Sequence, residues 1–230
     1  MAITFVDGSA NSGSGTSVTP TEPSGTAQND LIIMATCVNT IDGVWTDPAD
    51  FTEIDQNTAT LGAPDTRNYI GYKIRGADAG SGYAMSYSGT SGNYASLISC
   101  YRGVDTSQPI DTTYVNATHF TSATNAMNTA AKAIDTTTAN AWVVLYYFST
   151  NPALTGVGAP SGFTQRDAGT GTVNAYTCDF ADGAASTVTP GVFTHTGSDG
   201  QDPRIFTISL REIQSVAASK LAVLKRNRHF

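Results

Sequence analysis

The sequence predicts an all-β protein, an antiparallel β-sandwich of jelly-roll type built from two related halves and followed by a short C-terminal helix. Composition is the first indication, because only 13% of the 230 residues are charged, about half the usual share, while 22 are glycine. The second is that apolar runs of strand length alternate with turn residues along the chain. The third is that the order of these segments recurs about 110 residues later.

The recurrence compares residues 29–103 with residues 140–212. Three matched pairs show a nearly constant offset: Asn29 and Asn140 are 111 apart, Phe51 and Phe163 are 112 apart, and Arg102 and Arg211 are 109 apart. Each half offers only about five or six strands, which is few for an independent core. We therefore predict one domain, residues 1–212, in which the two halves are intercalated around a shared core.

In the first half, the predicted strands follow one another with short turns between them. An opening strand at residues 1–7 precedes a Gly/Ser stretch, residues 8–15, which predicts a turn or a flexible loop. Residues 31–38 form an unbroken apolar run, as expected for a strand buried on both faces. Further strands are expected at residues 17–20, which end at a proline, and at 69–74, 83–87 and 95–101.

The second half repeats this order after a polar segment, residues 104–130. There we expect a long surface excursion and a strand around residues 112–120. Further strands are expected at residues 141–148, 162–166, 173–180, 191–195 and 205–212. His195 occupies an alternating position in one of these strands, and we expect its side chain to face outward.

Residues 213–230 depart from the strand pattern and predict a helical, basic tail. One helical face carries Ile213, Ala217, Leu221 and Leu224. A helix this short needs a surface to pack on, so we expect a contact with a partner subunit; packing on its own domain, or a frayed solvated end, is the alternative. The tail holds four of the twelve basic residues, whereas residues 1–214 hold the other eight and all nineteen acidic residues, a net charge of −11. Such an acidic body argues against nucleic acid as a partner.

Few residues form a pattern suited to catalysis or metal binding. The three histidines and three cysteines match no metal-binding or catalytic spacing, so we expect reduced, partly buried cysteines and no cofactor. Acidic residues gather around one turn: Asp42, Asp47, Asp50, Glu53 and Asp55. Turn chemistry is our interpretation, and a Ca²⁺ site or a glycosidase carboxylate pair are the alternatives. Trp45, in a Gly-rich loop, is predicted to be an exposed anchor for protein or sugar.

The sequence also carries no signal that points to a membrane. The first residues lack the basic segment of a secretory signal, and the apolar runs are far shorter than the roughly eighteen residues that a spanning helix needs. We expect a protein made in the cytoplasm that has no membrane partner.

The ordered segments resemble a recurrent kind of tailed-bacteriophage structural protein. The likeness is carried by Asn29-Asp30-Leu31-Ile32-Ile33, Asp47-Pro48-Ala49-Asp50-Phe51-Thr52, Ile70-Gly71-Tyr72-Lys73-Ile74, Tyr101-Arg102-Gly103-Val104-Asp105 with Pro109-Ile110-Asp111, and Ala159-Pro160-Ser161-Gly162-Phe163-Thr164. It spans about residues 25–212. Such proteins usually have Trp in the repeated turn, where this chain has Phe51 and Phe163. The resemblance implies a β-sandwich virion component of the head or tail, and it implies no catalytic residue.

From this resemblance we expect a non-enzymatic virion protein made in the host cytoplasm. Its expected role is that of a capsid decoration (cement) protein, which binds the major capsid protein on the capsid surface and stabilises the head by bridging subunits. We expect it to bind itself as well, as a homotrimer. The expected contacts are residues 8–15, Trp45, Leu221, Leu224, Lys225, Arg226 and Arg228. The alternative is a tail- or fibre-associated module that binds carbohydrate or a host receptor.

Overall fold

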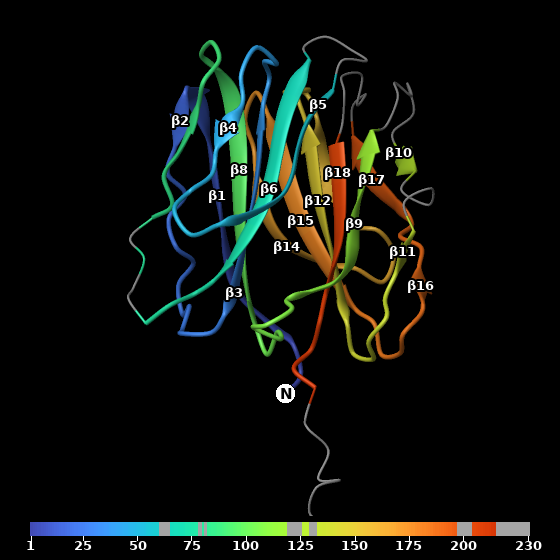
Figure 1. Cartoon of the computed structure of the whole chain (residues 1–230). Helices are drawn as coiled ribbons and strands as arrows, with labels where there is room; N and C mark the ends of the chain where they lie inside the picture. The colour runs from blue at the N-terminus through green and yellow to red at the C-terminus, as the bar shows by residue number, and fades with distance from the viewer. Residues whose placement is uncertain are drawn as a thin grey trace, which may run out of the picture.

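Two five-stranded antiparallel sheets face each other at the centre of the computed structural model (Figure 1). The structure describes residues 1–59, 65–77, 80, 82–118, 126–128, 133–196 and 204–214. Every regular element within these residues is a strand, and every strand pair is antiparallel, which confirms the predicted all-β sandwich. The predicted C-terminal helix lies outside the described residues.

Eight of the described strands belong to the first half of the chain and ten to the second. The first half contains β1 (Thr4–Gly15), β2 (Ser17–Val18), β3 (Leu31–Val38), β4 (Trp45–Thr46), β5 (Thr52–Ala59), β6 (Thr66–Ile74), β7 (Met85–Tyr87) and β8 (Gly92–Arg102). The second half contains β9 (Ile110–Thr118), β10 (Ala126–Asn128), β11 (Ile134–Asp135), β12 (Trp142–Ser149), β13 (Thr155–Gly158), β14 (Thr164–Gly169), β15 (Asn174–Ala181), β16 (Thr187–Val188), β17 (Val192–Thr196) and β18 (Arg204–Leu210).

Both halves wind their strands in the same order. The large sheets have the orders β1-β8-β3-β6-β5 and β9-β18-β12-β15-β14, which correspond strand by strand. The small sheets β2-β7-β4 and β10-β17-β13 correspond in the same way, and the second half adds the pair β11-β16. In a jelly roll, the first, eighth, third and sixth strands lie side by side in one sheet. The second, seventh and fourth strands lie in the sheet opposite. Each half is therefore a jelly roll whose fifth strand has joined the large sheet.

The correspondence extends to irregularities of the backbone. A β-bulge in β1 at Val6 matches one in β9 at Asp111. A second bulge, in β5 at Ile54, matches one in β14 at Arg166. Bulges shift the pairing register by one residue and redirect a side chain, so these two matches align the halves at these positions. The pairing of β9 with β18 has a further register shift, between Thr207 and Ser209, that the pairing of β1 with β8 lacks.

Three cores fill this arrangement. The central core lies between the two large sheets and receives side chains from both halves. Each outer core lies between one large sheet and the small sheets of the same half. Along β3, Leu31 and Ile33 belong to the central core, whereas Ile32 and Met34 belong to the outer core. Because β3 is buried on both faces, it has no polar face, which explains the unbroken apolar run in the sequence.

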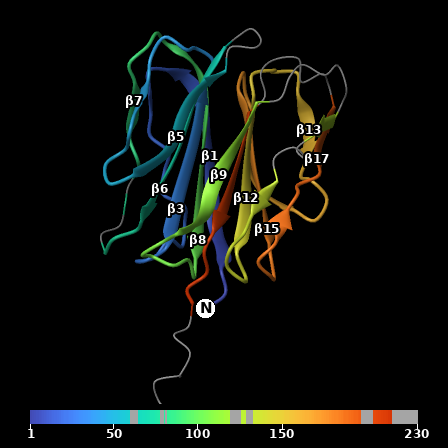
Figure 2. The same cartoon turned by 45° about the vertical axis from the view of Figure 1, so that its right-hand side comes forward.

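Each large sheet is built from one half of the chain, as Figure 2 shows. The expectation that the halves are intercalated is therefore wrong. The jelly-roll winding returns the last strand of each half beside its first, so each half completes its own sheets. The two halves then pack against each other through the central core.

The glycine-rich stretch near the N-terminus also differs from expectation. Residues 8–15, predicted to be a turn or a flexible loop, continue β1, which pairs with β8 as far as Gly15 opposite Gly92. The aromatic ring of Tyr94 covers this part of the strand, since a Cβ atom added to Gly13 would lie 2.8 Å from Tyr94 Oη. Cross-strand aromatic cover of this kind stabilises glycine in a sheet, a tertiary effect that local composition does not reveal.

Candidate functional site

The two halves and both ends of the described chain meet at one pole of the molecule, at the bottom of Figure 1. Glu212 forms an isolated β-bridge with Val104, and the Ile213 amide donates a hydrogen bond to the Gly103 carbonyl at 3.0 Å. The Met1 amino group lies 3.7 Å from Glu212 Oε1. The described chain therefore ends beside the N-terminal strand.

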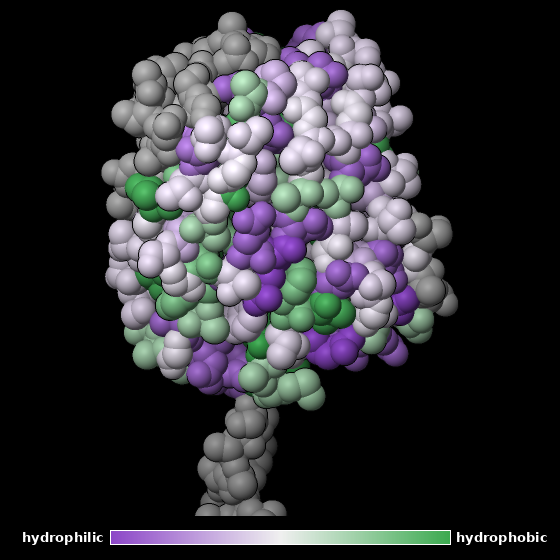
Figure 3. All heavy atoms as spheres, turned by 180° about the vertical axis from the view of Figure 1, so that it is seen from behind, coloured by the Kyte–Doolittle hydropathy of each residue, from purple (hydrophilic) through white to green (hydrophobic). Residues whose placement is uncertain are grey.

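Apolar side chains are sparse on the surface. The large apolar side chains that are exposed among the described residues are Met1, Ile41, Val44, Val192 and Ile213. On the face shown in Figure 3, hydrophobic residues are scattered among polar ones. Scattered apolar residues are normal for a protein surface and do not by themselves mark a binding site. Met1 and Ile213, however, both lie at the pole.

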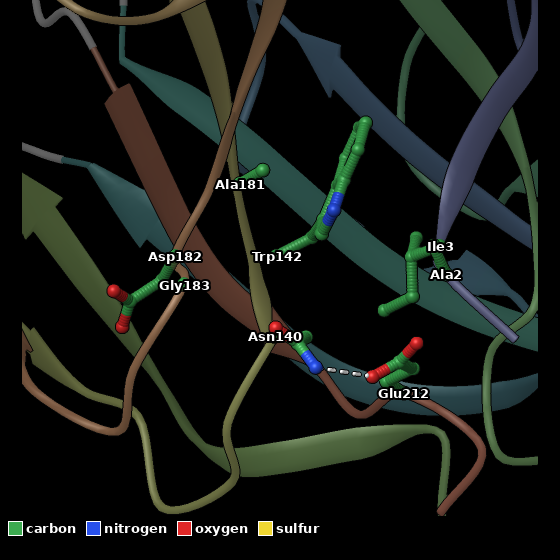
Figure 4. Close-up of a pocket in the computed structure, with 8 residues that line it drawn as sticks. All are labelled: Ala2, Ile3, Asn140, Trp142, Ala181, Asp182, Gly183 and Glu212. Atoms are coloured by element: carbon green, nitrogen blue, oxygen red, sulfur yellow. Dashed lines mark hydrogen bonds between the residues drawn. The ribbon is translucent and has the colours of Figure 1, made fainter.

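A hollow of about 400 Å³ opens at this pole, between the two halves (Figure 4). It is lined by Ala2, Ile3, Asn140, Trp142, Ala181, Asp182, Gly183 and Glu212. Trp142 begins β12 and Ala181 ends β15, so most of the lining belongs to the second half. The volume falls within the range of sites that bind small ligands, and such sites often lie where two domains meet.

Trp142 forms the aromatic wall of the hollow. Its indole is half-buried and points upward from the strand in Figure 4. Two contacts from the interior fix the ring. Tyr101 packs against it edge to face, with the ring centroids 6.0 Å apart, and the Arg166 guanidinium lies 5.8 Å from its centroid. Such contacts hold a ligand-binding ring in place beforehand, so the ring loses less conformational freedom when a ligand binds.

A carboxylate network next to Trp142 joins the two halves. Arg166 Nε lies 2.8 Å from both carboxylate oxygens of Asp179, and Tyr101 Oη donates a hydrogen bond to Asp179 at 3.1 Å. Burial raises the pKa of Asp179, and the bonds from Arg166 and Tyr101 offset part of that rise. Burial, followed by the charge of Asp179, raises the pKa of Tyr101 well above its ordinary value, so Tyr101 remains a neutral donor. Arg166 also stacks 4.9 Å from the ring centroid of Phe5 in the first half.

The polar part of the hollow consists of one carboxamide and two carboxylates. Asn140 Nδ2 donates a hydrogen bond to Glu212 Oε2 at 2.8 Å, drawn as the dashed line in Figure 4. Asp182 accepts hydrogen bonds from the hydroxyls of Thr136 and Ser186, at 2.6 and 3.0 Å. The Asn140–Glu212 pair thus gives the hollow a polar floor, whereas the Asp182 carboxylate, bonded to Thr136 and Ser186, points away from the indole in Figure 4.

A second hollow, of about 270 Å³, shares Asp182 with the first. Its aromatic surface is the ring pair Phe163 and Phe180, with centroids 5.4 Å apart. Ser161, Ser186, Thr187, Val188 and Thr189 complete its lining. In the first half the corresponding place has Lys73 in the position of Phe180, where its ammonium lies over the rings of Phe51 and Tyr83.

The prediction that Trp45 is an exposed anchor is wrong. Its side chain is only 3% exposed and packs on Tyr87, with ring centroids 5.1 Å apart. Gln56 fixes the backbone on either side, because its Oε1 accepts from the Trp45 amide and its Nε2 donates to the Trp45 carbonyl. Strand β4 thus turns the indole into the outer core of the first half. The remaining predicted contacts, Leu221, Leu224, Lys225, Arg226 and Arg228, lie outside the described residues.

His195 and the cysteines are buried. His195 is 6% exposed and lies on the same face of β17 as Phe193, so the predicted outward orientation is wrong. The three cysteines are free and buried, in agreement with the expected reduced state. Burial raises the pKa of Cys37 and of Cys100 to about 12 each, which makes both thiols poor nucleophiles.

The acidic residues around the first turn stabilise local structure. Hydrogen bonds from Thr90 lower the pKa of Asp42. Asp55 accepts a hydrogen bond from Asn57, and Asp50 Oδ2 lies 3.7 Å from Lys73 Nζ. Within the described ranges, no group of three or more His, Cys, Asp or Glu side chains is placed to bind a metal ion.

No family model, curated protein or solved structure matches this chain. In the part of the chain that the structure describes, none of the elements is a helix long and apolar enough to cross a membrane. The geometry of the pole is therefore the main basis for a functional proposal.

Proposed function

We propose that this protein is a non-enzymatic structural component of a tailed-bacteriophage virion, a decoration protein on the outside of the capsid. The proposal rests chiefly on one observation, that two jelly rolls share a central core and both ends of the described chain lie at one pole. Strands buried on both faces make a stiff body, and the pole gives that body one end for attachment. The ordered segments that resemble phage structural proteins support a place in the virion.

In this proposal the pole faces the capsid. Met1 and Ile213 supply apolar contact there, since their side chains are 74% and 40% exposed. The tail adds Leu221 and Leu224 together with the basic residues Lys225, Arg226 and Arg228. Residues 1–214 carry eight basic and nineteen acidic residues, whereas the tail carries four basic ones. A basic tail is attracted to an acidic capsid surface.

Binding across a seam stabilises the head because expansion or rupture must then break additional contacts. A contact of standard size buries about 1,600 Å² in total, and its affinity depends on how well its centre is packed. A homotrimer around a local threefold axis would engage three such contacts at once and gain avidity without any new contact. The partners in this proposal are the major capsid protein and the protein itself.

Co-sedimentation with empty capsids of the same virus tests this proposal. We expect saturable binding by the full chain and none after deletion of residues 215–230, with the β-sheet circular dichroism unchanged. A matched control replaces Lys225, Arg226 and Arg228 by Gln and keeps the leucines; it should bind more weakly and with less dependence on salt. Full occupancy by the truncated protein would refute the tail contact. Failure of the full chain to bind capsids would refute decoration.

The second candidate is a tail- or fibre-associated module that binds carbohydrate. The specific observation in its favour is the hollow at the pole, with an indole wall and a carboxamide and carboxylates beside it. Retention on host polysaccharide without binding to capsids would favour this candidate over decoration.

A further inference from the structure

We propose that the hollow at the pole is a binding site for a neutral pyranose residue of a glycan, with Trp142 as the surface on which the sugar stacks. This inference concerns the free protein, because a pole that faces the capsid would cover the hollow. It rests on three observations: how the second half departs from the first at this place, the chemistry of the lining, and the size of the hollow.

The aromatic wall is the first departure from the duplicated pattern. Leu31 pairs with Ile74 between β3 and β6, and Trp142 pairs with Ala181 between β12 and β15, in the same register. Trp142 thus takes the place of Leu31. Leu31 is fully buried in the central core, whereas Trp142 is half-buried and lines the hollow. A large amphipathic ring, which also packs against the central core, has replaced an aliphatic core residue at the hollow between the two halves.

Asp182, the residue after Ala181, also differs from its equivalent in the first half. The Arg75 amide donates to the Asp30 carbonyl at 2.9 Å and the Asp182 amide donates to the Ala141 carbonyl at 2.8 Å, so Arg75 and Asp182 are equivalent. In the first half Arg75 Nη2 forms an ion pair with Glu22 at 3.2 Å, both side chains are about 10% exposed, and the neighbouring hollow, of about 290 Å³, has no tryptophan in its lining. In the second half Asp182 lines two hollows instead.

A third difference removes a charge pair. In the first half, Arg102 forms a two-point ion pair with Asp30, at 2.9 and 2.7 Å, at the end of the large sheet. The position equivalent to Asp30 is Ala141, so this closure is missing from the second half, where Arg211 instead lies 3.9 Å from Asp111. The side chains that close the sheet end in one half are thus absent or reassigned in the other.

The lining fits a sugar better than a charged ligand. A pyranose presents an apolar face of C–H groups, which packs on an aromatic ring, and an edge of hydroxyls, which exchange hydrogen bonds with carboxamides and carboxylates. Asn140 and Glu212 are already oriented by their mutual bond, and each retains lone pairs or an N–H for further bonds. Ile3, on the other side of the hollow in Figure 4, adds an apolar side chain to the lining, although it is only 3% exposed and belongs to the central core. The two carboxylates and the acidic body disfavour an anionic sugar.

Fluorescence of tryptophan tests binding directly, because the chain has only two tryptophans and Trp45 is buried. The Trp45→Phe variant leaves Trp142 as the only indole. We would titrate this variant with the methyl pyranosides of glucose, galactose, mannose and N-acetylglucosamine. We expect a saturable change with at least one of them, and saturation-transfer NMR signals from the ring protons of the same sugar bound to the unaltered protein.

Two variants locate the site. Trp142→Leu installs the residue that the first half has at this place and should weaken binding of the responding sugar by about tenfold or more, as judged by NMR. Glu212→Gln keeps a partner for Asn140 and should weaken binding less. Asp50→Asn, at a distant turn, is the control and should bind as the unaltered protein does. Circular dichroism and thermal melting verify that each variant is folded.

Three outcomes would overturn the inference: no saturable response to any of the four sugars, equal binding by Trp142→Leu, or binding of a cationic probe such as arginine amide at this hollow in place of the sugars. These outcomes are separate from those of the capsid experiment. Trp142→Leu should sediment with capsids as the unaltered chain does if the tail makes the capsid contact, so the two proposals can fail independently.

Discussion

The two halves of this molecule keep the same backbone pairing but place their charged side chains differently. In the first half, ion pairs close the edge of the fold: Arg102 with Asp30 at 2.7 Å and Arg75 with Glu22 at 3.2 Å. In the second half, the ion pair of Arg166 with Asp179 lies next to the central core, where it contacts the first half. The comparison shows that the same backbone pairing can carry charged side chains that have different partners and positions.

The bulge shared by β5 and β14 shows how this happens. It redirects Ile54 in the first half toward the central core, and it redirects Arg166 in the second half toward Asp179. Asp179 stands opposite Thr164 just as Tyr72 stands opposite Thr52, so the ion pair replaces an apolar pair within an unchanged backbone. The bulge fixes the direction of the side chain, and the sequence decides whether that direction is used for packing or for charge.

The largest effect on this comparison should come from Asp179→Ala. The substitution leaves the Arg166 guanidinium, one quarter exposed, without its carboxylate and removes the acceptor of Tyr101. We expect the free energy of unfolding to fall by about 3 kcal/mol, measured by urea denaturation at neutral pH. At the equivalent place in the first half, Tyr72→Phe should change the free energy of unfolding by less than about 0.5 kcal/mol. Similar losses at both positions would mean that packing, and not the ion pair, joins the halves.

The sequence predicted strands best where packing alone determines them. Residues 31–38 coincide with β3, because a strand buried on both faces leaves an apolar run that no turn interrupts. The pairing of β1 with β8 could not be predicted in the same way. Its glycines and serines are those of a loop, and only the long partner strand and the ring of Tyr94 make them a strand. The sequence repeat was therefore recognised from residue 29 onward, although the matched strands begin at Thr4 and Ile110.

The candidate site was harder to predict because it depends on what covers each strand. Trp45 stands in a Gly-rich loop, where exposure is the natural expectation, yet the small sheet turns it into an outer core. Trp142 begins an apolar strand, where burial is the natural expectation, yet it is half-buried: it packs against the central core and also lines the hollow. Exposure here is decided by neighbours distant in sequence, which the local pattern does not reveal.

A smaller effect should come from the bulge that β1 and β9 share, where Val6 corresponds to Asp111. Burial alone would raise the pKa of Asp111, but hydrogen bonds from the amides and hydroxyls of Thr137 and Thr138 outweigh it and lower the pKa. Because the folded pKa is below the unfolded one, ionised Asp111 stabilises the fold above the ordinary carboxyl pKa of about 4, and this is lost as pH falls through the folded value.

Asp111→Asn should therefore lower the free energy of unfolding by about 1–2 kcal/mol at neutral pH, and by less at about pH 3. Denaturation curves at both pH values measure the difference. Val6→Ala, at the equivalent bulge, carries no titrating group, and its effect should be the same at both pH values. If the loss caused by Asp111→Asn were independent of pH, the carboxylate charge would have no part in fixing Thr137 and Thr138.

The smallest effect concerns the turn before β5 and β14, which has the same hydrogen bond in both halves: Phe51 N to Pro48 O at 3.1 Å and Phe163 N to Pro160 O at 2.9 Å. The residue before each phenylalanine has a positive φ, 65° for Asp50 and 87° for Gly162. Only glycine adopts this backbone conformation without strain; for another residue the strain is about 1 kcal/mol.

Asp50→Gly should therefore raise the free energy of unfolding by up to about 1 kcal/mol, and Gly162→Asp should lower it by a similar amount, both measurable as shifts of the thermal midpoint. The ion pair of Asp50 with Lys73 should matter little, because the Asp50 side chain is 85% exposed. The turns are far apart in sequence and share no partner, so the double variant that exchanges the two residues should melt close to the unaltered protein. If Asp50→Gly instead lowered the midpoint, the contact with Lys73 would outweigh the strain of the turn, and the two turns would be alike in backbone but not in what stabilises them.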